Sequence, residues 1–528
     1  MLRVRIALLL LSVTGGALAQ GPPFDLLIRN AKIVDGSGNP WFYGDIGIRA
    51  GRIAAVGAIG DAPARARVDA GRMVAAPGFI DIHTHGRGGI FEVPTAPNYI
   101  RQGVTTLLEG QDGSSPLPLR PFLDKLSATP LSVNFGMFTG QGSIRRAVVG
   151  LENRRATREE IQKMIELAGQ AMQDGAFGLS TGLFYVPGNY TPTEEIVEIA
   201  RAVGALGGIY ISHIREEASQ VIQSVQEVIR IAEETHLPAQ VTHHKIVGRA
   251  NWGRSTETLR LIEQARARGV DVTADQYPYT ATSTGTAALF PQWALEGGND
   301  QLMERLRRPD IRARIKAEIV FRILNDRGAG DPKNVAIASC PFDPTLAGKN
   351  LAEVTALAGR EPTAENAADT AIELQQKGGC AAVYHALDEG DLERILRAPF
   401  TMIGSDGEIP LFGAGVPHPR SYGTFARVLG RYVRERRVLT LEEAVRRMSS
   451  FPAARLGLSD RGLLRPGMKA DLVILDPARI RDTATFAQPH QYAEGVVHVF
   501  VNGKPVVLNG KVTQERPGEV LYGPARRP

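Results

Sequence analysis

Cysteine is scarce in this 528-residue chain, which contains only Cys340 and Cys380. Two cysteines exclude a disulfide framework as the main source of stability, and the sequence leaves open whether they pair or stay as free thiols. A large excess of one charge is also missing, because the formal net charge is +5 and no long basic block occurs. Nucleic-acid binding is therefore not expected. The length and composition suit a globular enzyme with one large barrel and an accessory domain.

The chain also lacks an apolar run long enough to cross a bilayer comfortably. The apolar stretch at 6–13 follows Arg3 and Arg5, and Ala-Leu-Ala at 17–19 fits an A-x-A cleavage motif. This pattern predicts a signal peptide over residues 1–19. We therefore expect an exported protein, periplasmic or secreted, with no membrane attachment after cleavage. An uncleaved membrane anchor is the alternative.

Both ends of the remaining chain have the short alternating pattern of β-strands. Residues 24–29 and 496–501 are examples, and the Asn-Gly pair at 502–503 predicts a hairpin turn. We expect one small β domain built from residues 20–76 and 460–528.

Between these ends, candidate strands alternate with candidate helices. The predicted strands are 103–108, 175–180, 208–213, 239–243 and 270–275, and the predicted helices are 158–173, 193–206, 217–235 and 255–268. Repeated strand–helix units predict the α/β class and a parallel (β/α)8 barrel over residues 77–459. The pattern breaks at about 285–360, which predicts an insertion over the barrel mouth. It is either a lid or an excursion with no role in catalysis.

The most informative motif follows the strand candidate at 78–82, which leads into His83 and His85. Because side chains alternate along a strand, these two imidazoles project to the same side and can chelate a divalent cation. Three more candidates end other apolar runs: His213, His243 and Asp406. Barrels of this kind place their chemistry at the C-terminal strand ends. The five residues therefore predict a metal site on one barrel rim.

Longer motifs surround these residues. They are GFIDIHTH at 78–85, GLSTGL at 178–183, HIREE at 213–217, HHK at 243–245, DQYPY at 275–279, IGSDG at 403–407 and HPR at 418–420. Together they resemble the amidohydrolase superfamily, specifically its N-acyl-D-amino-acid deacylase (D-aminoacylase) family. The resemblance implies a TIM-like metal-dependent hydrolase barrel, a small β domain built from both chain ends, and one or two zinc ions.

The resemblance also implies a role for each of the five residues. His213 and His243 would hold the tight zinc, and His83 and His85 would form the second, often weaker, site. Asp406 would contact the metal or its water and act as the general base.

His243 has a histidine neighbour, so the choice between the two needs an argument. Strand alternation places His243 and Lys245 on one face and His244 on the other. Lys245 matches a family residue near the substrate, which favours His243 as the ligand. His244 is the alternative.

The chain departs from the family at one metal ligand. The family usually has a cysteine after the second strand that often bridges two zinc ions, whereas this chain has Asp112 at the matching position and Glu109 close by. Either carboxylate is a candidate ligand, and the alignment favours Asp112. Carboxylate in place of thiolate keeps zinc binding possible and makes manganese or cobalt more favourable.

The activity that the resemblance implies is hydrolysis of small N-acyl-D-amino acids to a carboxylate and a free D-amino acid. Lys245 and Arg420 are the candidates for the substrate carboxylate, and Tyr277 and Ser283 match family positions in the same pocket. Residues 133–138 contain no lysine, which argues against hydantoinase-like and dihydroorotase-like members. Two alternatives stay open: hydrolysis of a dipeptide-like or cyclic amide, and a non-catalytic exported binding protein.

Overall fold

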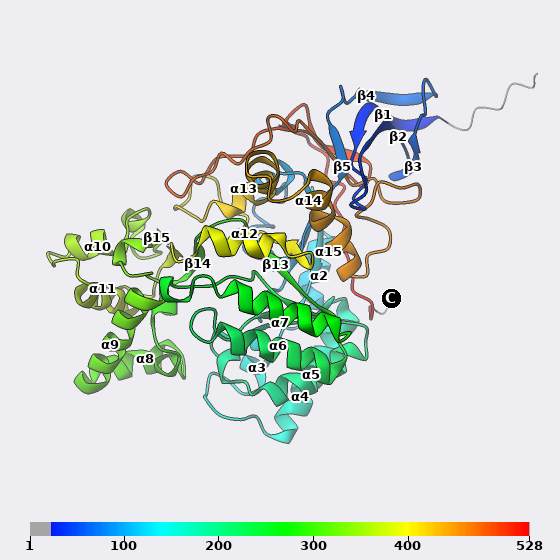
Figure 1. Ribbon diagram of the computed structural model, residues 1–528. Coiled ribbons are helices and arrows are strands. Elements are labelled where there is room, and N and C mark those ends of the chain that lie inside the picture. The colour runs from blue at the N-terminus through cyan, green and yellow to red at the C-terminus, as the bar shows by residue number, and fades with distance from the viewer. Residues whose placement is uncertain (1–22, 527–528) are drawn as a thin grey trace, which may run out of the picture.

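The computed structural model describes residues 23–526, and the predicted signal peptide lies outside them. Figure 1 shows a β domain, a central barrel covered by helices, and an insertion that projects on the side away from the β domain. Within residues 23–526, none of the helices combines the length and hydropathy that a membrane crossing requires.

Eight parallel strand positions form the barrel. The strands are β6 (Phe79–Asp81), β7 (Val104–Glu109), β8 (Asn134–Met137) with its continuation β9 (Thr139–Gly140), β10 (Gly178–Gly182), β11 (Ile209–His213), β12 (Ala239–Val241), β13 (Val272–Gln276) and β17 (Thr401–Ile403). The barrel closes where the Asp406 N–H donates to His83 O at 2.8 Å and the His85 N–H donates to Gly407 O at 2.7 Å. The predicted (β/α)8 barrel is confirmed.

Helices cover the outside of the barrel (Figure 1). They are α1 (Pro97–Ile100), α2 (Arg120–Ser127), α3 (Gln141–Val148), α4 (Arg158–Asp174), α5 (Thr193–Gly204), α6 (Val221–Thr235), α7 (Ser255–Ala267), α12 (Glu389–Arg397), α13 (Arg420–Arg427), α14 (Leu441–Met448) and α15 (Ser450–Arg455). Local sequence sets their ends. For example, α4 begins with a capping box between Thr157 and Glu160 and ends at Gly175, whose φ is 125°.

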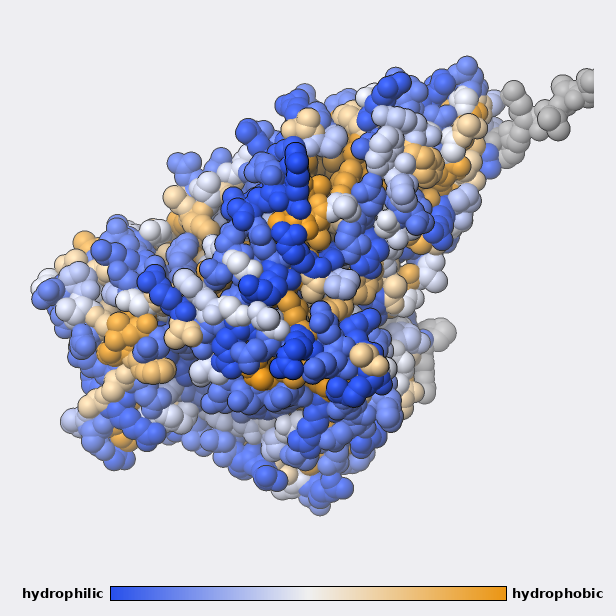
Figure 2. Space-filling model, viewed as in Figure 1, coloured by the Kyte–Doolittle hydropathy of each residue, from blue (hydrophilic) through white to orange (hydrophobic). Residues whose placement is uncertain are grey.

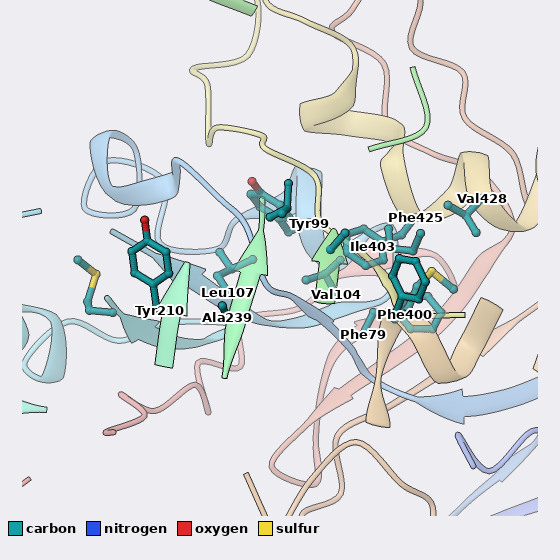
Figure 3. Close-up of a cluster of buried hydrophobic side chains, with 14 of the residues drawn as sticks. Phe79, Tyr99, Val104, Leu107, Tyr210, Ala239, Phe400, Ile403, Phe425 and Val428 are labelled. Atoms are coloured by element: carbon teal, nitrogen blue, oxygen red, sulfur yellow. The ribbon is translucent and has the colours of Figure 1, made fainter. Parts of the chain in front are cut away.

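The main hydrophobic core lies between the strands and these helices. Figure 3 shows Phe79, Phe400 and Phe425 gathered in one part of it, and the Phe79 and Phe425 rings stack at 5.8 Å. Both faces of a barrel strand are buried. The sequence of such a strand is therefore a run of apolar residues and does not alternate between apolar and polar residues. The face in Figure 2 is mainly hydrophilic, with small scattered hydrophobic patches.

A nine-stranded sheet built from both chain ends forms the β domain. Its strands are β1 (Phe24–Ile33), β2 (Phe42–Arg49), β3 (Arg52–Gly57), β4 (Ala64–Asp69), β5 (Val74–Pro77), β18 (Leu472–Leu475), β19 (Val496–Val501), β20 (Lys504–Leu508) and β21 (Lys511–Val512). Antiparallel pairing of β5 with β18 joins the two ends. The predicted Asn502-Gly503 turn links β19 to β20, and both residues have positive φ.

The C-terminal segment differs from the predicted 460–528 part of this domain. After β21 the chain leaves the sheet and returns to the barrel. The Phe135 N–H donates to Glu519 O at 3.0 Å, and the Leu521 N–H donates to Phe135 O at 2.8 Å. These bonds satisfy backbone groups of β8 that would otherwise lack partners, a requirement that no local sequence pattern reveals.

The insertion has its own small antiparallel sheet, in the order β14 (Thr282–Gly285), β16 (Ala381–Tyr384) and β15 (Val335–Ser339). Its helices are α8 (Asn299–Arg307), α9 (Pro309–Asn325), α10 (Leu351–Leu357) and α11 (Ala364–Gln376). The predicted end near 360 is therefore too early. The insertion continues to Tyr384 because β16 returns to pair with β14 and with β15.

Cys340 and Cys380 form a disulfide inside the insertion, so the free-thiol alternative is wrong. We expect reduction to lower the stability of the insertion by about 2–4 kcal/mol, because the bond closes a loop across a sequence separation of 40. Thermal unfolding with and without reductant measures this change. The matched control is the Cys340→Ser/Cys380→Ser double variant, whose unfolding should not respond to reductant. If the thermal unfolding curves of the wild type with and without reductant are the same, the prediction is wrong.

Candidate metal centre and substrate cavity

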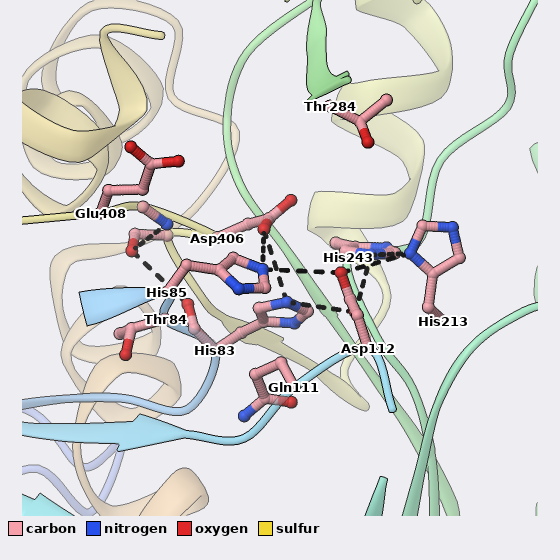
Figure 4. Close-up of polar contacts among 12 residues, drawn as sticks. His83, Thr84, His85, Gln111, Asp112, His213, His243, Thr284, Asp406 and Glu408 are labelled. Carbon is pink, nitrogen blue, oxygen red and sulfur yellow. Dashed lines mark hydrogen bonds and ion pairs between the residues drawn. The ribbon is translucent and has the colours of Figure 1, made fainter. Parts of the chain in front are cut away.

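The predicted metal-binding residues meet at the C-terminal ends of the barrel strands. His83 and His85 follow β6, His213 is the last residue of β11, and Asp406 follows β17. Figure 4 shows these side chains converging from different strands onto one centre, with Asp112 between the histidines.

The first cluster contains His83, His85, Asp112 and Asp406. Asp406 Oδ1 lies 2.9 Å from His85 Nε2 and 3.5 Å from His83 Nε2. Asp112 approaches the same two nitrogens, with its Oδ2 3.5 Å from His85 and its Oδ1 3.7 Å from His83. Two imidazoles and two carboxylates form a donor set that divalent cations bind well.

The second cluster contains Asp112, His213 and His243. Asp112 Oδ2 lies 3.4 Å from His213 Nδ1, and Asp112 Oδ1 lies 3.4 Å from His243 Nε2. The two ring nitrogens are 2.8 Å apart. Asp112 therefore belongs to both clusters and would be shared by cations held in them, as the resemblance implies for the residue at this position.

Glu109, the alternative to Asp112, lies outside both clusters. Its Oε2 accepts the Arg87 backbone N–H at 2.9 Å. Glu109 is still within β7, whereas Asp112 lies in the loop beyond it with a φ of 56°. That turn of the backbone brings the carboxylate of Asp112, and not that of Glu109, over the barrel mouth.

Two features of the centre fit a bound cation. His83 Nε2 and Asp112 Oδ1 are buried and have no hydrogen-bond partner, an arrangement that is costly unless a ligand satisfies them. Three non-glycine residues of the centre also have positive φ: Asp112 at 56°, His243 at 35° and Asp406 at 52°. Such backbone strain persists where the surrounding structure enforces it, often at functional sites.

His243 faces the centre, but strand alternation is the wrong reason. β12 ends at Val241, so His243 lies beyond the strand with left-handed φ. His244 points elsewhere, because its Nε2 lies 2.7 Å from Thr258 Oγ1. Burial and the neighbouring Lys245 ammonium lower the pKa of His243 to about 4, which keeps its imidazole neutral and available for a metal.

Asp275 is a residue of this centre to which sequence reasoning gave no role. It is completely buried, accepts the His243 backbone N–H at 2.8 Å, and lies 3.5 Å from His83 Nδ1. A carboxylate behind a metal-binding histidine orients the ring, so that the opposite nitrogen of His83 faces the centre. The DQYPY motif at 275–279 was the available signal.

The predicted substrate-binding residues line one cavity of about 560 Å³ that opens onto both clusters: Lys245, Tyr277, Ser283 and Arg420. The Tyr277 hydroxyl is buried and has no hydrogen-bond partner. Arg420 forms an ion pair with Asp406 Oδ2 at 2.7 Å. Although burial opposes ionisation, the Arg420 guanidinium and His83 hold the pKa of the Asp406 carboxyl well below its usual range.

Sequence reasoning missed a buried ion-pair network beside this cavity. Glu217 Oε1 lies 2.6 Å from Lys245 Nζ, and its Oε2 lies 3.1 Å from a nitrogen of Arg327. Arg327 belongs to the insertion and lines the cavity. Through Glu217, the insertion therefore contributes to the position of Lys245, which argues against a passive excursion.

We expect Arg327→Met to raise KM more than it lowers kcat, because Glu217 loses one of the two cations that position it and then holds the Lys245 ammonium less firmly. Removing one partner of a buried charged pair costs about 3–5 kcal/mol, part of which appears as lost stability. Steady-state kinetics and thermal unfolding measure the two effects separately. Arg322→Met is the matched control, since Arg322 pairs with Asp326 in the same insertion and is not among the cavity-lining residues. An unchanged KM contradicts the prediction.

Tyr185 is another residue that sequence reasoning missed, two positions beyond the GLSTGL motif. Its ring packs edge-on against His213 at 4.8 Å, and its hydroxyl lies 3.2 Å from Thr284 Oγ1. Burial and the nearby Asp112 carboxylate raise the pKa of Tyr185, so it stays protonated as a neutral hydrogen-bond donor in the cavity.

Comparison with known proteins agrees with this geometry. The sequence pattern of the amidohydrolase family matches residues 67–507. The chain belongs to the amidohydrolase family. This amidohydrolase is 40% identical to D-aminoacylase of Alcaligenes xylosoxydans xylosoxydans over 522 residues, which cover 94% of this chain and 98% of the relative.

Solved structures resemble the amidohydrolase over nearly its whole length. A structure of D-aminoacylase with a binuclear metal centre has a TM-score of 0.81 at 37% identity and covers 95% of this chain and 100% of its own. N-acyl-D-glutamate deacylase from Bordetella bronchiseptica, complexed with zinc and a phosphonate inhibitor, has a TM-score of 0.82 at 34% identity with the same coverage.

Proposed function

We propose that this amidohydrolase cleaves the amide bond of N-acyl-D-amino acids and releases a carboxylate and a free D-amino acid. One observation carries the proposal: two clusters of potential metal ligands and the cations Lys245 and Arg420 face a single cavity. An amide near the clusters and a free carboxylate near the cations can then be held at the same time. The relatives that match 94–95% of the chain, a D-aminoacylase and an N-acyl-D-glutamate deacylase, support the D-stereochemistry.

A divalent cation in this centre supplies a Lewis acid that lowers the pKa of water to about 7 and polarises a carbonyl. His83, His85, Asp112, His213, His243 and Asp406 are the residues that would hold it. We propose zinc as the resident metal, because imidazole and carboxylate suit it. The zinc of the B. bronchiseptica deacylase supports this choice. Metal analysis of the purified protein tests it, and a preparation that is active with manganese or cobalt but not with zinc contradicts it.

Asp406 is the general base of the proposed reaction. Arg420 holds its Oδ2 at 2.7 Å, which leaves Oδ1 directed at the first cluster. Because the pKa of this carboxyl is low, Asp406 is ionised before the reaction and accepts a proton from the attacking water. The same oxygen then delivers that proton to the leaving nitrogen.

Binding groups surround this base. Lys245 and Arg420 supply positive charge for the substrate carboxylate, and the unpaired Tyr277 hydroxyl offers a neutral donor beside them. Tyr185, on the side of His213, offers a second neutral donor toward the amide. Burial of these groups excludes water and strengthens each electrostatic interaction.

Acetate release from N-acetyl-D- and N-acetyl-L-amino acids tests the proposal directly. Purified mature protein loaded with zinc, and separately with manganese, is assayed on a panel of side chains. Turnover of the D-forms alone supports the deacylase function. Metal-loaded protein that cleaves neither enantiomer contradicts it and favours the non-catalytic alternative.

We expect N-acetyl-D-leucine to be cleaved about 10–100-fold faster than N-acetyl-D-leucinamide, because the amide loses the charged hydrogen bonds to Lys245 and Arg420. The ratio of the two kcat/KM values measures this requirement. Equal values contradict it and favour the alternative of a dipeptide-like or cyclic amide, which needs no free carboxylate.

We propose that the protein is exported to the periplasm or secreted. The predicted signal peptide supports export, and so does the Cys340–Cys380 disulfide, since such bonds persist in oxidising compartments. N-terminal sequencing of the protein from a periplasmic or culture fraction tests this, with Gln20 as the expected first residue. Recovery of the intact chain in the cytoplasm contradicts it.

A further inference from the structure

Arg146 is unlike the other cations of the substrate cavity. Lys245 pairs with Glu217 at 2.6 Å, Arg327 pairs with Glu217 at 3.1 Å, and Arg420 pairs with Asp406 at 2.7 Å. Arg146 also lines the cavity and is exposed, and its guanidinium has no ion pair or hydrogen bond with any residue in 23–526. It is thus a free cation beside the proposed substrate site.

The position of Arg146 in the barrel separates it from the α-carboxylate site. Arg146 lies on α3, which follows the third barrel strand, whereas Tyr277 and Arg420 follow the seventh and eighth. In an eight-stranded barrel these positions lie on opposite sides of the mouth, with the metal-ligand clusters between them. A substrate whose α-carboxylate contacts Arg420 therefore reaches Arg146 only with its far end.

The shape of the cavity leaves room for that far end. The part of the lining that comes from the loop after β7 and from α3 is mostly glycine and serine, with Gly113, Ser114, Gly142 and Ser143 accompanying Arg146. Little side-chain bulk therefore fills this side. A cavity of about 560 Å³ also exceeds what a simple N-acetyl amino acid requires, because cavities of roughly 300–1,000 Å³ accommodate drug-sized ligands.

The charges of the cavity direct a second anion toward Arg146. Glu408 lines the opposite side, near Asp406 and His85 in Figure 4, and forms no ion pair within residues 23–526. The negative charge of the Glu408 carboxylate repels a second substrate carboxylate from the space beside Arg420. Arginine binds a carboxylate through two parallel hydrogen bonds. Arg146 is therefore the site in this cavity that suits a second carboxylate of the substrate.

We infer that Arg146 is a specificity-determining residue for substrates that carry a second carboxylate, remote from the α-carboxylate. This inference rests on the proposed deacylase function and narrows its substrate class. The second carboxylate is carried either by the acyl group, as in an N-succinyl amino acid, or by the side chain, as in an N-acyl-D-glutamate. Both sources present the same chemistry to the guanidinium.

Two substrate pairs distinguish the sources. N-succinyl-D-leucine is compared with its uncharged analogue N-butanoyl-D-leucine, and N-acetyl-D-glutamate is compared with N-acetyl-D-glutamine. Release of the free D-amino acid is measured for the wild type, Arg146→Gln and Arg155→Gln. Arg155 is the matched control, because it is exposed in the segment after α3 and is not among the cavity-lining residues.

The wild type should prefer the charged member of at least one pair, and that pair identifies the source. Arg146→Gln should reduce this preference about tenfold, a modest effect because the guanidinium is exposed to solvent and salt. Arg155→Gln should leave it unchanged. Arg146→Glu should reverse the preference, which a merely structural role does not explain.

Three results overturn the inference. They are a wild type without preference in either pair, a preference that survives Arg146→Gln, and an equal loss in Arg155→Gln. Failure of the proposed function looks different, because the wild type then releases no D-amino acid from any of the four compounds. Cleavage of the uncharged members without charge preference refutes the role of Arg146 alone.

Discussion

Asp406→Asn is expected to lower kcat by about 10²–10⁴-fold, the range that a positioned general base contributes. Asparagine keeps the size of the side chain, but its neutral amide cannot take a proton from water. In the wild type, Asp406 Oδ1 lies 2.9 Å from His85 Nε2 and faces the first cluster, while Oδ2 is held by Arg420. Steady-state kinetics on the best D-substrate of the panel measures the loss.

Asp406 is also a member of the first cluster, so two causes of lost activity need to be separated. Metal content and thermal unfolding of the variant show whether the centre and the fold persist. Glu408→Gln is the matched control, because it makes the same chemical change in the same cavity at a carboxylate outside both clusters. Retained metal with kcat less than about tenfold below the wild type contradicts the role of general base.

Asp112→Ala is expected to have the second large effect. Asp112 lies within 3.4–3.7 Å of all four histidines, so its loss removes a ligand from both clusters at once. Metal affinity should fall by more than about 100-fold, because even the residues that orient metal ligands contribute 10–100-fold. Titration with zinc under competition from a chelator measures the affinity, and activity should fall with it.

Two variants make this test specific. Glu109→Gln should leave metal affinity nearly unchanged, because Glu109 binds Arg87 and belongs to neither cluster. Asp112→Cys should restore zinc binding and shift preference away from manganese, since thiolate is the softer ligand. If Glu109→Gln releases the metal and Asp112→Ala does not, the bridging role belongs to Glu109 and this assignment is wrong.

The sequence by itself determined the barrel and most of its centre. Strand–helix alternation predicted helices close to the observed bounds, for example 158–173 against Arg158–Asp174 in α4. The candidate metal ligands could be predicted because they follow apolar strands. In a parallel barrel, the C-terminal ends of the strands meet at one rim. The hairpin of the β domain could be predicted from Asn502-Gly503, because these two residues favour the positive φ that the turn requires.

Tertiary structure decided what depends on contacts between distant segments. The choice of Asp112 over Glu109 followed from a left-handed turn beyond β7, which strand periodicity does not describe. The Cys340–Cys380 pair required β15 and β16 to lie side by side, with the two Cα atoms 4.4 Å apart.

The contribution of the insertion to the cavity was equally invisible in the sequence. Arg327 and Glu217 lie 110 positions apart, and no local motif joins them. Local patterns report the periodicity and turn preference of neighbouring residues, whereas ion pairs and shared ligands depend on where the folded chain places remote ones. That physical difference separates what the sequence determined here from what only the fold decided.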